Sequence, residues 1–180
     1  MKIWSAISRA FLGWLLIIKG DTGWREHFTI SVAGFATALV VFLFFGFLAI
    51  AAASTYQGMP GVLGILDALL AQCLWIAAIL ISIRVTAAIL KSKTKTFELL
   101  IPAIYLMVAY LLVGSVLNLV LPLAVLLVSV ALLYPFYRLG RVAGGWPWAN
   151  AAAFAVLTVV LLVGLPWALY MLSSTAAPLA

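Results

Sequence analysis

Few residues in this 180-residue chain are of the types that carry out chemistry. The acids, the single histidine and the single cysteine are Asp21, Glu26, Asp67, Glu98, His27 and Cys73. No group of them has the spacing of a metal-binding motif, so no zinc site is predicted. No glycine-rich loop follows a strand and no serine is placed beside a base, so neither a phosphate-binding loop nor a hydrolase is predicted. We therefore expect no catalytic residue, no metal and no cofactor.

Asp67 is the first candidate for a functional side chain, because it falls inside an apolar segment. An ionisable group within a membrane span is a functional candidate by default, since burying its charge costs free energy. Gln72 follows five positions later and shares part of the same helical face. If the helix begins near Gly61, Asp67 lies about 9 Å along it, which water can reach. The interpretations are a wetted carboxylate favoured by the helix dipole, a proton- or cation-coupled site, and misplaced span boundaries.

The composition indicates a membrane protein. Hydrophobic residues make up 68% of the sequence and charged residues only 8%, whereas a soluble domain carries about 25% charged residues. In so apolar a chain, the formal net charge of +6 indicates contact with anionic lipid at one membrane face. No soluble basic domain is predicted, so nucleic acid is not an expected partner.

The segment 97–137 determines the predicted topology, because it is nearly all apolar and too long for one span. A helical span takes about 20 residues. We therefore predict a helical hairpin that turns at Gly114–Asn118, where glycine and asparagine favour a turn, with Pro122 opening the returning helix. The predicted fold is an all-α integral membrane protein, one domain over residues 1–180. Its five transmembrane helices are expected at about 28–53, 62–84, 97–114, 121–137 and 149–172.

The basic residues alternate from one connection to the next. All ten Lys and Arg residues fall in the N-terminal segment, at 84–95 or at 138–141, and none falls at 54–61, at 115–120 or after 172. Basic connections stay on the cytoplasmic side of a membrane. We therefore expect a cytoplasmic N-terminus and an external C-terminus in a bacterial inner (plasma) membrane.

Residues 2–19 form a predicted amphipathic helix that precedes the first span. Its apolar face carries the aromatic residues Trp4, Phe11 and Trp14, while Lys2 and Arg9 lie on the opposite face. A helix of this kind lies in the plane of the headgroups with its aromatic side chains inserted. Two other interpretations stay open: a short span or uncleaved signal sequence, and a helix whose apolar face packs on the bundle.

The segment from Pro122 to Gly140, which ends in the sequence Leu133-Tyr134-Pro135-Phe136-Tyr137-Arg138-Leu139-Gly140, resembles the fourth span and following loop of Yip1-type membrane proteins. In that family a proline-led apolar helix ends in a tyrosine-x-x-tyrosine turn and a glycine. The five-span plan with a central hairpin is also similar, and the resemblance covers about residues 97–172. The chain lacks the Tyr-x-x-x-Pro feature expected in the third span and the acidic arm of eukaryotic members. The resemblance implies a non-enzymatic membrane scaffold or adaptor.

The predicted function is a non-catalytic, multi-pass membrane scaffold or assembly subunit that contacts anionic lipid and a protein partner or a second copy of itself. The residues expected to make these contacts are Trp4, Arg9, Phe11, Trp14, Lys91, Lys93, Lys95, Arg138 and Arg141. The alternative is a small transporter or channel subunit that uses Asp67, with Gln72 beside it.

Reporter fusions test the predicted topology. Fusions after Lys95 and after Arg141 should report the cytoplasmic side, and a fusion after Ala180 should report the external side, because basic connections are retained in the cytoplasm. A cytoplasmic signal from the Ala180 fusion would contradict the hairpin at 97–137.

Overall fold

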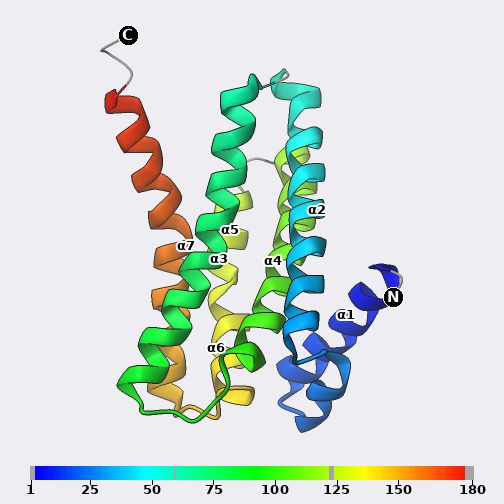
Figure 1. Cartoon of the computed structure of the whole chain (residues 1–180), viewed down its shortest axis with the longest axis vertical. Helices are drawn as coiled ribbons and strands as arrows, with labels where there is room; N and C mark the ends of the chain where they lie inside the picture. The colour runs from blue at the N-terminus through cyan, green and yellow to red at the C-terminus, as the bar shows by residue number, and fades with distance from the viewer. Residues whose placement is uncertain (1–2, 59, 122–123, 177–180) are drawn as a thin grey trace.

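The computed structural model describes residues 3–58, 60–121 and 124–176, and every regular element in those ranges is helical. In chain order the elements are α1 (Ile3–Lys19), the 3-10 helix η1 (Thr22–His27), α2 (Val32–Gln57), α3 (Val62–Ile89), α4 (Thr96–Val120), α5 (Ala124–Ala131), α6 (Leu133–Val142) and α7 (Trp148–Ala176). The long helices stand side by side, and α1 leans away from them at its N-terminal end (Figure 1).

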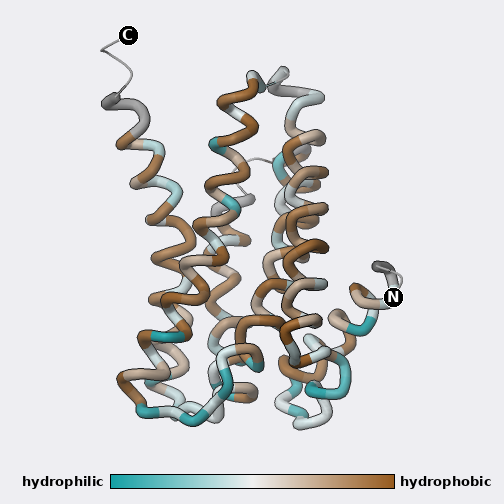
Figure 2. The backbone as a smooth tube through the Cα atoms, in the orientation of Figure 1, coloured by the Kyte–Doolittle hydropathy of each residue, from teal (hydrophilic) through white to brown (hydrophobic). Residues whose placement is uncertain are grey.

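Four helices in the described ranges are long and apolar enough to cross a membrane. Their apolar stretches are Val32–Thr55, Val62–Ile89, Thr96–Asn118 and Trp148–Leu172. This confirms the predicted all-helical class, which suits a membrane because a helix satisfies its own backbone hydrogen bonds. Figure 2 shows hydrophobic residues along most of the length of the helices and hydrophilic residues concentrated at the lower end of the bundle.

The turn predicted at Gly114–Asn118 is wrong, because α4 continues through these residues to Val120. The amide of Leu121 still bonds to the carbonyl of Leu117 at 2.7 Å. Glycine and asparagine favour a turn when water competes for the backbone, whereas a helix in an apolar surrounding keeps its hydrogen bonds. The chain therefore reverses after Leu121, and Pro122 lies outside the described residues.

The single helix predicted over 121–137 is also wrong, because the chain forms two short helices there. The break comes between Ala131, the last residue of α5, and Leu133, the first of α6. Proline has no amide proton and its ring clashes with the carbonyl four residues earlier. For Pro135 that carbonyl belongs to Ala131, so the break lies where the proline requires it. Helix α6 then continues past the predicted end to Val142.

Helix α2 begins four residues later than predicted. The hydroxyl of Ser31 accepts a hydrogen bond from the amide of Gly34 at 3.1 Å, which caps the first turn. Asp21 caps the short helix η1, because its carboxylate accepts a hydrogen bond from the amide of Gly23 at 2.9 Å. The residues between α1 and α2 therefore form a separate small element beside the bundle.

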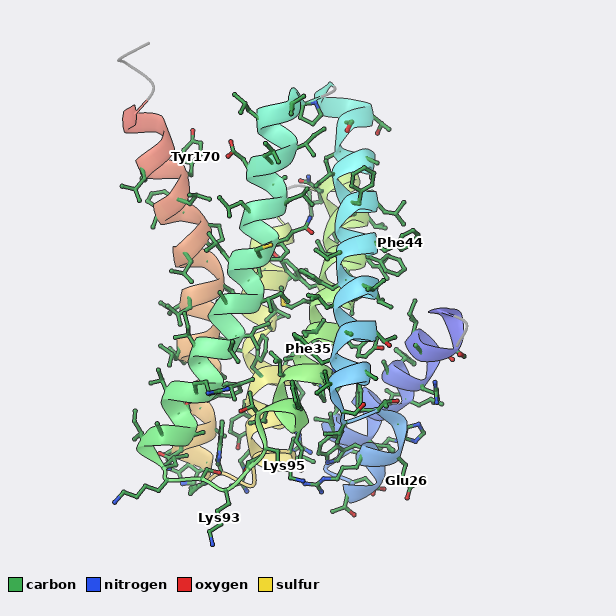
Figure 3. The ribbon with its side chains drawn as sticks, viewed as in Figure 1. Glu26, Phe35, Phe44, Lys93, Lys95 and Tyr170 are labelled. Atoms are coloured by element: carbon green, nitrogen blue, oxygen red, sulfur yellow. The ribbon has the colours of Figure 1, made fainter. Side chains whose placement is uncertain are left out.

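One end of the bundle carries η1, residues 90–95 and residues 141–147, and we call it the basic end. Two hydrogen bonds join the last two segments: Thr94 Oγ1 donates to the Gly144 carbonyl at 3.1 Å, and Trp146 Nε1 donates to Ser92 Oγ at 3.2 Å. The side chains of Lys93 and Lys95 point away from the bundle there (Figure 3). The two basic connections thus lie together, as the predicted hairpin requires.

Helix α1 occupies the predicted range but packs against the bundle. Trp14 is buried, and its indole Nε1 donates to the carbonyl of Pro102 in α4 at 2.9 Å. Ala10 and Ile17 are buried on the same face, whereas Phe11 is 65% exposed. Insertion of Trp14 among lipid headgroups is therefore wrong, because the indole finds a hydrogen-bond acceptor inside the protein. The side chain of Trp4 lies outside the described part.

Arg138 of α6 joins the C-terminal end of α1. Its Nη2 donates to the carbonyl of Ile17 at 3.3 Å, where a cation is favoured by the helix dipole. Gly20 follows with φ +88°, and a Cβ there would lie 2.8 Å from Arg138 Nη2. Arg138 was predicted to contact lipid or a partner, but its half-buried guanidinium instead contacts α1.

Substituting Trp14 tests how α1 is held. Trp14→Phe should lower the free energy of unfolding by about 1 kcal/mol or more, because the hydrogen bond to Pro102 is lost. Thermal unfolding in detergent measures the change. The control is Trp148→Phe, which removes a 71% exposed indole and should cost much less. Equal effects of the two substitutions would contradict the packing of α1.

Candidate functional site

A small polar cavity lies between α1, η1, α2 and α4 near the basic end. Its volume is about 80 Å³. The polar side chains that line it are Arg9 from α1, His27 from η1, Thr29 from the segment between η1 and α2, Thr37 from α2, and Tyr105 from α4. None of its ten lining residues is acidic. Three parts of the sequence, around residues 9, 27–37 and 105, therefore bring one permanent cation, one histidine and three hydroxyl groups together.

Packing around Phe28 holds the histidine side of this cavity. Phe28 is buried directly after His27, and its ring packs against Tyr105 with centroids 6.0 Å apart and against Trp24 with centroids 6.1 Å apart. Arg25 and Glu98 form an ion pair at 3.0 Å that ties η1 to the first turn of α4. These contacts fix η1 against the bundle, so His27 faces the cavity from a held element.

Two of the polar side chains have local hydrogen bonds that limit what they do. Arg9 Nε donates to the carbonyl of Ser5 at 3.1 Å, which holds the guanidinium against its own helix. Thr37 Oγ1 donates to the carbonyl of Ala33 at 2.9 Å, so its proton is already used. The donor groups in the lining suit an anionic or hydrogen-bond-accepting ligand. The cavity offers no carboxylate or thiolate to serve as base or nucleophile.

The structure does not bring Asp67 and Gln72 together. Asp67 is exposed on α3 and lines none of the cavities described here. Gln72 is 5% exposed and faces α2, where a Cβ at Gly46 would overlap its amide group. The Gln72 Oε1 atom is buried without a hydrogen-bond partner. Gln72 therefore packs where α2 and α3 approach closely, and it does not form a shared polar site with Asp67.

A second group of polar residues lies inside the bundle. Tyr110 of α4 and Ser129 of α5 share a hydrogen bond at 2.9 Å, and the Trp75 ring packs edge-on against Tyr110 with centroids 5.6 Å apart. Trp75 and Tyr110 line two cavities of about 230 and 300 Å³, the second of which also touches Asn118. This group contains no ionisable acid or histidine. We assign it to helix packing.

The structure places the predicted contact residues that it describes in two settings. Arg9, Phe11 and four basic residues of the two connections are exposed: Lys91, Lys93, Lys95 and Arg141. Trp14 and Arg138 hold α1 instead. His27 and Tyr105 were not predicted as site residues, because nothing in the sequence near either one points to a shared cavity. The only signal was the polar run of residues 24–27.

In the ranges that the structure describes, no three His, Cys, Asp or Glu side chains lie close enough to hold a metal ion. No family model, curated protein or solved structure matches the chain. The resemblance to Yip1-type proteins therefore stays a prediction, and the site is argued from its own geometry.

A double-mutant cycle tests the contact between α2 and α3. Gly46→Ala should destabilise the protein by roughly 1–3 kcal/mol, because the added methyl group overlaps the Gln72 amide. In a Gln72→Ala background the same change should cost much less, since the overlapping atoms are gone. Gly164→Ala in α7 is the control, because a Cβ there meets no atom within 4 Å. Additive effects in the cycle would contradict this contact.

Proposed function

We propose that the chain is a non-catalytic, five-span membrane scaffold or assembly subunit. In this proposal the basic end faces the cytoplasm and contacts anionic lipid and a partner protein, and the C-terminus is external. The membrane proposed for this topology is the bacterial inner membrane. The resemblance of residues 97–172 to Yip1-type proteins is in keeping with such a role.

The path of α5 and α6 supports a fifth crossing. The two helices together run about 28 Å at 1.5 Å per residue, close to the thickness of about 30 Å of the hydrocarbon core. Helix α6 packs on α7 and ends at the basic end, beside the loop that bonds to residues 92–94. Neither α5 nor α6 is long enough alone, so we propose that they cross as one broken span.

The observation that carries the proposal is the arrangement of cations at the basic end. Four cations are exposed there: Lys91, Lys93, Lys95 and Arg141. The three lysines lie on the loop after α3, and Arg141 lies just before the loop after α6. Hydrogen bonds between residues 92–94 and residues 144–146 hold these two loops together. Each basic residue near an anionic membrane surface contributes about 1 kcal/mol of attraction. A held cluster of such residues also recognises an acidic protein surface, because electrostatic complementarity selects partners.

The exposed position of Asp67 argues against the alternative function, a transporter or channel subunit that uses this residue. A coupling carboxylate has to face a cavity and change protonation or ion occupancy during the cycle. Asp67 is exposed on the surface of α3 instead. An acid near the N-terminal end of α3 is favoured by the helix dipole, and this accounts for its presence without a pathway.

Purification in mild detergent tests the scaffold. The wild-type chain should retain a stoichiometric partner, identified by mass spectrometry. The triple variant Lys91→Gln, Lys93→Gln, Lys95→Gln should lose most of that partner while keeping its melting temperature, because the three side chains are exposed. Asp67→Asn, which removes one exposed charge near the other end of α3, is the control and should retain the partner. Retention by the triple variant, or loss with Asp67→Asn alone, would contradict the proposal.

A further inference from the structure

The polar cavity has the size and the donor groups of a phosphate site. Its volume is about 80 Å³. One molecule of liquid water occupies about 30 Å³, so the cavity has two to three times that volume. Arg9 supplies a permanent positive charge, and the His27 imidazole and the Tyr105 hydroxyl each supply a hydrogen-bond donor. With no acidic residue in its lining, the cavity attracts an anion and repels a cation.

Small residues line the cavity beside the polar groups: Ala6, Ala33 and Gly34. Arg9, Thr29 and Ala33 are exposed, so the cavity is an open recess that a lipid headgroup can enter. Several donors that converge on one anion bind it more strongly than a single exposed lysine does, because charge-assisted hydrogen bonds are among the strong ones.

An apolar stripe leads away from this cavity along α2. Ala33 and Thr37, which line the cavity, share one helical face with Val40, Phe44 and Phe47 at spacings of three and four residues. Val40 is 60% exposed and Phe47 is 58% exposed. The Phe44 side chain points outward from α2 on the side toward which α1 leans (Figure 3). The stripe and the N-terminal half of α1 form the two sides of a wedge.

The geometry points to a binding site for one anionic phospholipid in this wedge. Its phosphate group occupies the polar cavity beside Arg9, His27 and Tyr105, and one acyl chain lies along Val40, Phe44 and Phe47. The lipid headgroup then lies near the basic end, and its acyl chain extends toward the middle of the bundle. This inference rests on the proposed function, because it names the lipid for a surface proposed to face the cytoplasmic leaflet.

Native mass spectrometry of the full-length chain in neutral detergent tests the site. Phosphatidylglycerol should form a discrete adduct of one lipid per chain, and phosphatidylcholine with the same acyl chains should bind more weakly, since its choline group neutralises the phosphate. Arg9→Gln should weaken phosphatidylglycerol binding roughly tenfold, because charge-assisted hydrogen bonds to phosphate are among the strong ones. Tyr105→Phe, which keeps the ring and removes one donor, should weaken it by a smaller factor of about three.

Lys19→Gln is the matched control. It removes one positive charge from an exposed side chain of the same helix, α1, that does not line the cavity. Its effect on the one-lipid adduct should be less than about twofold, as for a screened surface charge. Equal losses from Arg9→Gln and Lys19→Gln would overturn the site in favour of diffuse surface attraction. Unchanged binding by both Arg9→Gln and Tyr105→Phe, with melting temperatures equal to wild type, would also overturn it.

Inorganic phosphate separates a lipid site from a site for a free anion. If the occupant is a lipid, millimolar inorganic phosphate should leave the phosphatidylglycerol adduct unchanged, because the acyl chain on α2 supplies much of the binding free energy. Displacement of the lipid by inorganic phosphate, with no dependence on acyl-chain length, would overturn the lipid assignment. The assay needs no partner protein, so its failure leaves the partner-retention result intact and the two proposals fail separately.

Discussion

The hydrogen bond from the Trp14 indole to the Pro102 carbonyl is the contact that holds α1, and with it one wall of the polar cavity, against the bundle. It joins α1 to α4 across 88 residues of sequence, and the bond from Arg138 to the carbonyl of Ile17 holds the same C-terminal half of the helix. With these two contacts α1 forms one wall of a cavity that Arg9 lines together with His27 and Tyr105.

The apolar surroundings of the long helices explain why most charged side chains gather at one end of the bundle. An apolar environment forces the long helices to satisfy their own backbone groups, so polar side chains are concentrated where helices end and loops meet. At the basic end the loops bond to one another through Thr94, Gly144, Ser92 and Trp146. The lysines between them therefore project from a held surface, and binding a partner there costs less ordering of the chain.

The sequence predicted the helical class and the positions of the four long helices, because uninterrupted apolar runs report both directly. The break at Leu132 was also accessible, since the effect of Pro135 on the carbonyl of Ala131 is a local rule. The turn after α4 was not, because glycine and asparagine behave differently in an apolar surrounding. The docking of α1 and the cavity depend on contacts between residues far apart in the chain, and no local pattern marks them.

Distances between spin labels at positions 8 and 93 test the docking of α1 most directly. In a Cys73→Ser background, Ser8→Cys and Lys93→Cys place nitroxides on two exposed positions, one on α1 and one on the loop at the basic end. A helix fixed by Trp14 and Arg138 should give one narrow distance distribution in neutral and in anionic nanodiscs. A broad distribution, or one that changes with lipid charge, would show an α1 that floats in the headgroup plane and would contradict the account.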